Sequence, residues 1–417
     1  MIVPVVFAAG LGLIALLGLR PRTGIGLLGS AFFLGVLGLG LWTHILLFVR
    51  IPVGLPSVLA GAGLLAAGIG LRGRPLFRVE WPRPTLAAIP LLLSGAFALA
   101  GALSWPYLGF DGEIFYALRA KSILQYGTFW NPDFLDPARL HLGARRPLLL
   151  PSIYADFALL SGTMDARLLR VWFALVHLSA LAVVADRFRL SPLWLAVLAW
   201  LPAFWHDSGG VFSGYADATL AMLFLLGFDA LREGDRRFGA FTLSAAVLLK
   251  QDAWPFLAVV AMATLVTRPR ELPRTVGILV VPALAVVTWT ILSSRLAPQP
   301  DLGPPNQMTL PTMAASLAWW PDVLGRLGSD LVKPKHWGLF WVVAMGALLL
   351  RAPRLSRDDA RWLLVILLQL LVYVAALATY REEIVMATRT QGMRLLLHLA
   401  PLMWLWVGRE PVSRSSF

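Results

Sequence analysis

The stretch GIGLLGSAFFLGVLGLGLWTHILLFV, residues 24–49, decides the fold class because it contains no Asp, Glu, Lys or Arg. A helix of about 20 such residues crosses the roughly 30 Å hydrocarbon layer of a membrane. Comparable runs recur along the 417 residues, which are 58% hydrophobic and only 14% charged, with a mean hydropathy of +0.72. Soluble domains carry about a quarter charged residues. The sequence therefore predicts an all-α polytopic membrane protein.

About 13 transmembrane helices are expected, together forming one integral membrane domain over residues 1–417. The first is expected to be retained, because no signal-peptide cleavage pattern precedes a soluble body. The expected spans are residues 2–19, 24–49, 51–71, 85–104, 168–185, 190–205, 215–231, 238–250, 254–267, 275–294, 338–350, 361–379 and 393–408.

The basic residues predict the orientation. The net charge of +13 comes largely from short loops between the apolar runs, and loops rich in Lys and Arg stay in the cytoplasm. We therefore assign the charge to orientation in the inner (cytoplasmic) membrane and not to binding of nucleic acid. The basic loops are residues 20–22, 72–83, 186–189, 232–237, 268–274 and 351–361, together with the C-terminal tail.

These loops share one side only if residues 148–160 do not cross the membrane. We place that segment in the outer interface, with the N-terminus outside and the C-terminus in the cytoplasm. Two large outer loops result, residues 105–167 and 295–337. Shorter outer segments are residues 205–217 and 380–394.

Several kinds of chemistry are excluded. The chain has no Cys, which removes disulfides, iron–sulfur clusters, Cys-based zinc sites and thiol nucleophiles. The P-loop, Rossmann and HExxH signatures are absent, and the His residues lack metal-ligand spacing.

The segment FDGEIFYALRAKSILQYG, residues 110–127, carries two acids at the start of an amphipathic, basic stretch. Its spacing predicts a helix lying in the interface plane. Asp111 is then either a simple helix cap or part of a site. Repetition of acids on the same side favours a site, because ionisable groups at apolar span ends are site candidates. The other acids at outer span ends are Asp207, Asp217, Asp252, Glu382 and Glu383.

Five motifs follow one another along the chain: FDGEIFYALRAKSILQYGTFW (110–130), RRPLLLPSIYADFALLSGTMDARLLRVWFAL (145–175), GYADATLAMLFL (214–225), LLKQDAWPFLAV (248–259) and RTQGMRLLLHLAP (389–401). In this order they resemble the C-type membrane glycosyltransferases, whose members include protein O-mannosyltransferases and the aminoarabinose transferase of lipid A. The resemblance covers a glycosyltransferase-like module of about residues 85–408. It implies transfer of a sugar from a polyprenyl-phosphate-linked donor to an envelope lipid, glycan or protein acceptor at the outer face.

The resemblance assigns Asp111 as the general base that takes a proton from the acceptor, a role that suits a carboxylate. Relatives often have two adjacent acids there, whereas this chain has Asp-Gly-Glu. The second catalytic role therefore goes to Glu113 or to no residue.

The donor phosphate is expected to meet basic residues. For Lys250, contact with the phosphate and a structural ion pair with Asp252 are equally favoured. For Arg145 and Arg146, the alternative to phosphate contact is that they are solvated surface residues. Arg394 is preferred over its neighbours because it stands at the apolar start of the last span, and His398 is expected to pack in the core. The assigned donor-phosphate residues are Lys250, Arg394, Arg389 and Arg146, and the assigned substrate-binding residues are Asp217, Tyr215, Asp252 and Lys121.

Two other functions are kept open: a lipid or sugar transporter (flippase), and a non-catalytic partner in envelope assembly. A transporter would favour polar groups near mid-span and broken helices in paired halves. A divalent metal held by the oxygens of Asp111, Glu113 and Asp217 is compatible with the sequence, but their spacing does not require one.

Overall fold

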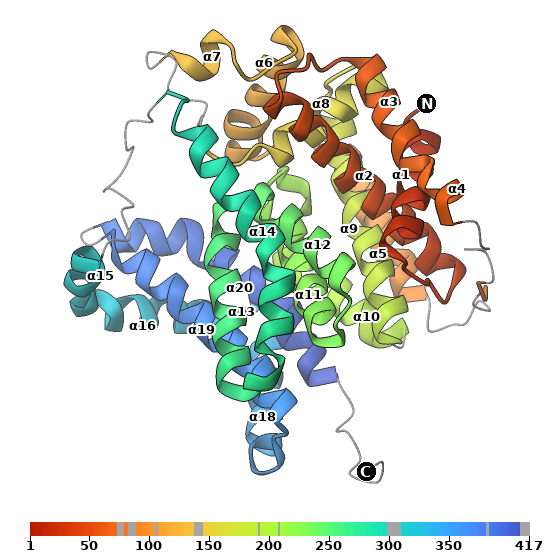
Figure 1. Ribbon diagram of the computed structural model, residues 1–417. Coiled ribbons are helices and arrows are strands. Elements are labelled where there is room, and N and C mark those ends of the chain that lie inside the picture. Colours follow the sequence, from red (N-terminus) through yellow and green to blue (C-terminus); the bar gives the residue numbers. More distant parts are fainter. Residues whose placement is uncertain are drawn as a thin grey trace.

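The structure is a computed structural model and describes residues 1–72, 79–81, 89–104, 107–136, 145–190, 192–206, 209–297, 310–380 and 383–408. Within these ranges the regular elements are helices, with one isolated β-bridge between Thr23 and Glu80. The predicted all-α class is confirmed (Figure 1). The α-helices are α1 (Ile2–Leu17), α2 (Gly24–Phe48), α3 (Leu55–Ala66), α4 (Gly68–Arg72), α5 (Ile89–Ser104), α6 (Leu118–Tyr126), α7 (Pro132–Leu135), α8 (Leu149–Ser161), α9 (Ala166–Phe188), α10 (Pro192–Ala199), α11 (Asp217–Glu233), α12 (Arg236–Leu249), α13 (Trp254–Thr267), α14 (Leu272–Ser293), α15 (Leu310–Ser316), α16 (Trp320–Leu331), α17 (Pro334–Trp337), α18 (Phe340–Arg351), α19 (Arg357–Ala378) and α20 (Ile384–Gly408).

Four helices of the described chain are long and apolar enough to cross a membrane: α2, α9, α14 with the short turn before it, and α19. Shorter apolar helices accompany them, including α1, α5 and α18. This pattern is compatible with a multi-pass membrane protein, while the number of 13 spans stays a prediction.

Several helix boundaries differ from the expected spans. The described residues of the segment 190–205 form the eight-residue α10 and a 3₁₀ turn at Pro202–Trp205. Leu201, which precedes Pro202, is extended, because a following proline disfavours the helical conformation. The predicted outer loop 380–394 is helical from Ile384 onward, so α20 continues unbroken to Gly408. The described part of the second outer loop also contains helices, chiefly α16.

The short helix α8 does not have the length of a span. Its 13 residues extend about 20 Å at 1.5 Å per residue. An interfacial helix would expose one face, but all residues of α8 except Leu159 and Ser161 are buried, and it packs against α2 and α6. That residues 148–160 do not cross the membrane stays a prediction, while the burial of α8 on all sides differs from the expected interfacial helix.

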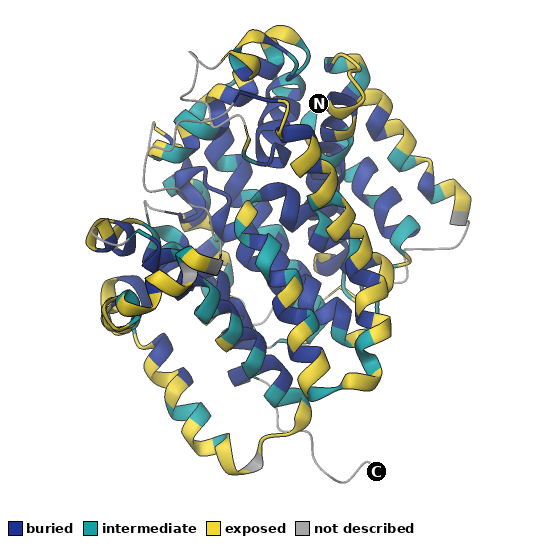
Figure 2. Ribbon diagram, turned by 60° about the vertical axis from the view of Figure 1, so that its left-hand side comes forward, coloured by how far each residue is buried: buried dark blue, intermediate teal, exposed yellow. Residues whose placement is uncertain are grey.

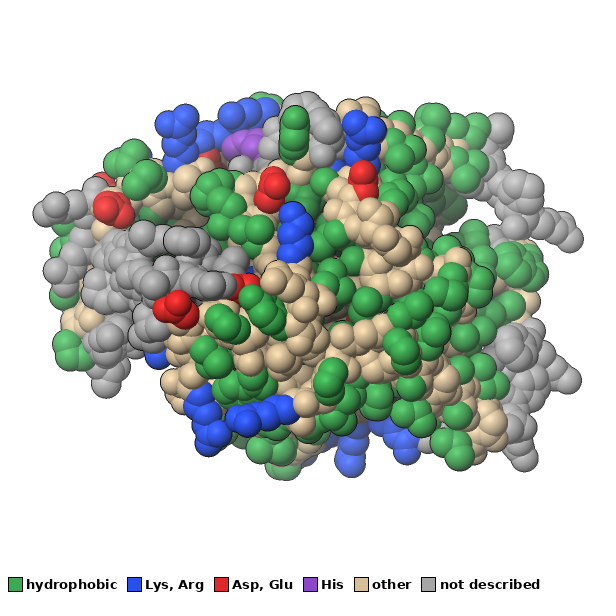
Figure 3. Space-filling view, turned by 90° about the horizontal axis from the view of Figure 1, so that it is seen from above, with side chains coloured by type: hydrophobic (Ala, Val, Ile, Leu, Met, Phe, Trp, Pro, Cys, Tyr) green, Lys and Arg blue, Asp and Glu red, His purple; other side chains and the backbone are tan. Residues whose placement is uncertain are grey.

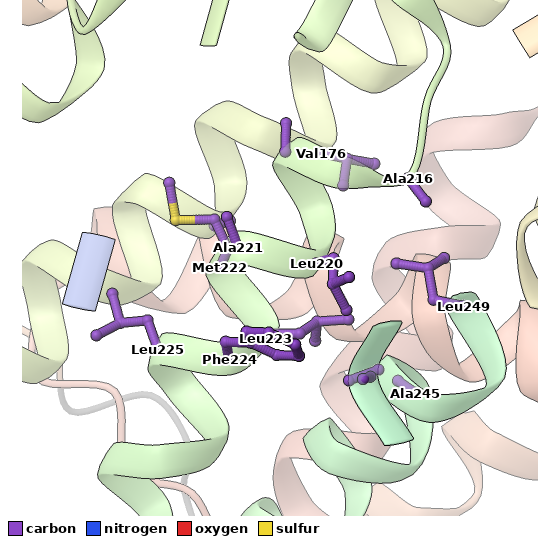
Figure 4. Packing of buried hydrophobic residues seen from close by; sticks show 14 of the residues in the cluster. Val176, Ala216, Leu220, Ala221, Met222, Leu223, Phe224, Leu225, Ala245 and Leu249 are labelled. Atoms are coloured by element: carbon purple, nitrogen blue, oxygen red, sulfur yellow. The ribbon is translucent and has the colours of Figure 1, made fainter. Parts of the chain in front are cut away.

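The core centres on α11, whose residues are nearly all buried. Figure 4 shows Leu220, Leu223 and Phe224 of α11 facing Ala245 and Leu249 of α12. Exposed residues concentrate on the outer helices (Figure 2). On α14 these exposed side chains are apolar, for example those of Val281, Leu284 and Ile291, which suits a lipid-facing surface.

Ion pairs join the loops that were predicted to share the cytoplasmic side. Arg232 lies 3.7 Å and Arg268 lies 3.0 Å from Asp358, and Arg361 lies 2.8 Å from Glu271. In Figure 1 the turn between α13 and α14 lies at the opposite end of the bundle from α6 and α7. These ion pairs bring the loops 232–237, 268–274 and 351–361 together, while the orientation of the basic loops in a membrane stays a prediction.

Candidate functional site

The centre of the candidate site is Asp217, the first residue of α11. Its side chain has no solvent exposure, yet it is surrounded by three nitrogen-bearing side chains from distant parts of the chain. Lys250 Nζ lies 2.7 Å from Oδ1, Arg394 Nη2 lies 3.0 Å from Oδ2, and His398 Nε2 lies 2.9 Å from Oδ1. A buried carboxylate needs such partners because isolated burial of a charge is very costly.

Asp111 belongs to the same cluster. Its Oδ2 lies 2.7 Å from Nη1 of Arg394, and its backbone N–H donates to the Tyr215 hydroxyl over 3.0 Å. The Asp111 side chain makes no helix-capping hydrogen bond, so the cap interpretation is wrong. Arg394 instead bridges Asp111 and Asp217, and its guanidinium stacks 4.5 Å above the ring of Tyr215.

The backbone explains why Gly112 separates Asp111 from Glu113. The turn before Asp111 is fixed by a 2.8 Å hydrogen bond from the Gly109 N–H to the Ser213 carbonyl. A Cβ atom on Gly112 would overlap that same carbonyl oxygen. Glycine permits this close backbone approach, and a second adjacent acid would not fit there without a shift of the backbone.

Two of the predicted residues lie outside the cluster. Glu113 is exposed and lines neither of the two cavities described below, and the same holds for Lys121. Both lie on the outer side of the segment formed by the π-helical turn Gly112–Ala117 and α6. The structure places neither Glu113 nor Lys121 beside the cluster, so a catalytic role for Glu113 and a substrate contact by Lys121 stay predictions.

Two cavities meet at Asp111 and Arg394, which line both of them. The smaller, of about 310 Å³, is also lined by Arg146, Lys250 and Asp252. The larger, of about 940 Å³, is lined by Tyr215 and by residues of α16, α17 and α20. The predicted phosphate-binding residues are thus divided between the two cavities, because Arg146 and Lys250 line only the smaller one and Arg389 lines only the larger one. Figure 3 shows the end of the molecule that carries α6 and α7, where charged side chains stand among hydrophobic ones.

Arg146 is held at the smaller cavity by its neighbours. Its guanidinium lies 4.0 Å from the centre of the Phe115 ring, and its carbonyl accepts a hydrogen bond from the buried Arg119. Burial, assisted by the charge of Arg146, lowers the pKa of Arg119 to about 9. The predicted alternative for Arg146, a freely solvated surface residue, does not match this packing.

Lys250 is paired, as one of its two interpretations predicted. Its Nζ lies 2.6 Å from Asp252 Oδ2 as well as 2.7 Å from Asp217. Oxygen and nitrogen atoms of Asp217, Asp252 and His398 lie within 4.8 Å of one another, a spacing that suits a metal ion. The ammonium group of Lys250 supplies the positive charge between these carboxylates. Among the described residues, the expected metal set of Asp111, Glu113 and Asp217 does not come together.

His398 was expected to be a core packing residue, and the structure gives it two polar contacts. Its Nε2 meets Asp217, and its Nδ1 lies 2.8 Å from the hydroxyl of Tyr373 on α19. Both ring nitrogens are thereby fixed, which orients the imidazole. The periodicity of α20 contained a signal for this contact, because His398 lies four residues after Arg394 and therefore shares its helix face.

Asp207 and Glu382 lie outside the described residues. Glu383 is exposed and lines neither cavity. Comparisons with protein-family models, curated proteins and solved structures find no match for this chain. The family resemblance therefore stays a prediction from the motifs, and the function must be argued from the site.

Proposed function

We propose that this protein is a membrane glycosyltransferase that moves a sugar from a polyprenyl-phosphate-linked donor to an envelope lipid, glycan or protein. The observation that carries the proposal is the position of Asp111. Its carboxylate lies where a small cavity with basic walls meets a larger one. Two substrates entering from the two cavities would meet beside a single carboxylate.

In the proposed reaction the donor phosphate occupies the smaller cavity near Arg146, Lys250 and Arg394. A hydroxyl or amine of the acceptor attacks the anomeric carbon of the sugar, and Asp111 takes its proton. The new bond to the anomeric carbon forms as the carbon–oxygen bond to phosphate breaks. The released polyprenyl phosphate keeps the bonding electrons, and the basic side chains stabilise the charge that develops on it.

Arg394 has a specific role in this proposal. Before the donor binds, its guanidinium bridges Asp111 and Asp217 at 2.7 and 3.0 Å. A phosphate competes for the same N–H groups because guanidinium binds phosphate oxygens in a forked geometry. Binding of the donor thus weakens the hold of Arg394 on Asp111 and makes that carboxylate a better base. Asp217 keeps Arg394 in place throughout.

A divalent ion would find carboxylate and imidazole ligands at Asp217, Asp252 and His398. When bound, it would supply a Lewis acid for the phosphate oxygens. Lys250 already neutralises these two carboxylates, so the ion would have to displace its ammonium group. Within the proposal Lys250 serves as the resident cation, and the transfer does not require a metal.

The proposed location is the inner (cytoplasmic) membrane, with the site facing outward. The grouping of the basic loops at the end opposite α6 and α7 supports this orientation.

The test uses the purified protein in nanodiscs with a set of polyprenyl-phosphate sugars, followed by mass spectrometry of released polyprenyl phosphate. Comparison of envelope glycans and lipids with and without the protein identifies the acceptor. Release that depends on the wild-type protein is expected. An unchanged envelope, together with no turnover of any donor, would overturn the proposal.

A further inference from the structure

The larger cavity is built mainly from two helical faces. Val323 and Leu327 of α16 are buried, and α16 packs against α20. A neighbouring face of α16 presents Asp322, Arg326 and Ser329 to the cavity. These positions recur at helical spacing. The polar face of this amphipathic helix therefore forms a wall of the cavity that leads to Asp111.

Basic side chains outnumber acidic ones in this cavity. Among the described lining residues there are five Lys and Arg against three Asp, and His206 and His336 add two imidazoles. Two of the basic groups are already paired, since Lys333 contacts Asp330 and Arg394 contacts Asp111.

The remaining basic groups are Arg326, Lys335 and Arg389. Among the described residues none forms an ion pair with any of these three side chains. Asp322 is the one remaining acid among the described residues of the lining. The cavity thus offers an excess of unpaired positive charge.

The cavity is also large enough for a substrate headgroup. Its volume of about 940 Å³ lies near the upper end of the range for ligand sites, about 300–1,000 Å³. The smaller cavity has about 310 Å³ and is lined by Arg146, Lys250 and Arg394, where the proposed reaction places the donor phosphate. An electrostatically focused pocket of this kind attracts a ligand of the opposite charge.

We propose that the larger cavity binds the acceptor and that this acceptor is a phosphorylated sugar headgroup, held by Arg326, Lys335 and Arg389 beside Asp111. This inference rests on the proposed transferase function, which supplies the reason for a second substrate. The imidazole of His336, whose ring lies 5.0 Å from that of His206, provides a hydrogen-bonding group for a sugar hydroxyl.

The binding test uses the full chain in nanodiscs of neutral lipid and two probes. Glucose 1,6-bisphosphate represents a soluble phosphorylated sugar, and dihexanoyl phosphatidic acid represents a lipid phosphate. Titration calorimetry should detect the bisphosphate and show no heat with glucose. The double variant Arg326→Gln/Lys335→Gln should weaken binding about tenfold or more, because charge-assisted contacts are lost. Arg270→Gln is the matched control, since Arg270 is exposed and lines neither cavity.

A third variant should change the affinity for the bisphosphate in the opposite direction. Asp322→Asn removes an acid from the lining and should tighten binding of the bisphosphate. Tighter binding of the lipid probe than of the bisphosphate would identify a lipid-attached acceptor phosphate, and the reverse would identify a soluble or glycan-attached one. Failure of both probes to bind, or equal binding by wild type and the double variant, would overturn the proposal.

The transfer assay separates this inference from the proposed function. If wild-type protein transfers sugar equally well to charged and neutral acceptors, the proposal of an anionic acceptor is wrong, and the proposed transferase function is retained. If the bisphosphate binds through Arg326 and Lys335 but no donor is ever turned over, the transferase and the acceptor role both fail, and only a phosphate-binding cavity remains.

Discussion

The substitution Asp217→Asn tests the buried cluster most severely. The Asp217 carboxylate has no solvent exposure and contacts Lys250, Arg394 and His398. Asparagine keeps the shape of the side chain but not its charge. The amide oxygen can still accept hydrogen bonds, whereas its NH₂ group points at a cation on the other side. Lys250 and Arg394, which are largely buried, would then each keep a single carboxylate partner. That partner is Asp252 for Lys250 and Asp111 for Arg394.

Removing one partner of a buried ion pair costs about 3–5 kcal/mol. The retained amide oxygen and the remaining carboxylates offset part of this loss. We therefore expect Asp217→Asn to lower the free energy of unfolding by about 3 kcal/mol. Asp111→Asn should cost less, about 1 kcal/mol or below, because Asp111 is partly exposed and loses a single ion pair.

The assay is reversible unfolding of the purified protein by SDS in mixed micelles, followed by tryptophan fluorescence. The double variant Asp217→Asn/Lys250→Met should be less destabilised than the sum of the single variants, by about 1 kcal/mol or more, since the two side chains are in contact. A loss below about 1 kcal/mol for Asp217→Asn, or strict additivity in the double variant, would refute the view that this cluster is a buried network of charges.

Three further predictions follow from the geometry. Lys250→Met should raise the KM for a polyprenyl-phosphate donor roughly ten- to hundredfold, as expected for a lost charge-assisted contact, and an unchanged KM would place the phosphate elsewhere. Gly112→Ala should destabilise the protein by about 1–3 kcal/mol through overpacking against a backbone carbonyl, whereas Gly277→Ala, which meets no neighbour, should be neutral or stabilising. In this Cys-free chain, single cysteines at the exposed positions Lys121 and Arg270 should react with an impermeant thiol reagent from opposite sides of the membrane, and labelling of both from one side would contradict the predicted topology.

The sequence predicted the helical class and the grouping of the charged loops for a clear reason. Long apolar runs leave few alternatives to helices in a membrane, and the basic loops mark one side. It did not predict where helices end, because short apolar runs look alike whether they cross a membrane or lie buried. Helix α8 shows this limit, since its apolar composition reflects burial within the protein.

The candidate site was predicted in part. Asp111, Asp217, Lys250 and Arg394 come together as expected, because each stands at the end of an apolar run where a charge is expensive. Glu113 lies two residues from Asp111, yet its side chain is exposed. Sequence spacing alone could not reveal this, since the direction of the chain after Asp111 depends on the contact between Gly112 and Ser213.

The most direct test of the central claim compares Asp111→Asn with Glu113→Gln in the same transfer assay. Both variants should fold, as checked by SDS unfolding, because neither carboxylate lies in the fully buried part of the cluster. Loss of a general base lowers turnover about 10²–10⁴-fold, so Asp111→Asn should fall by that factor while Glu113→Gln stays near wild type. Near-normal turnover by a well-folded Asp111→Asn protein would contradict the assignment of Asp111 as the catalytic base.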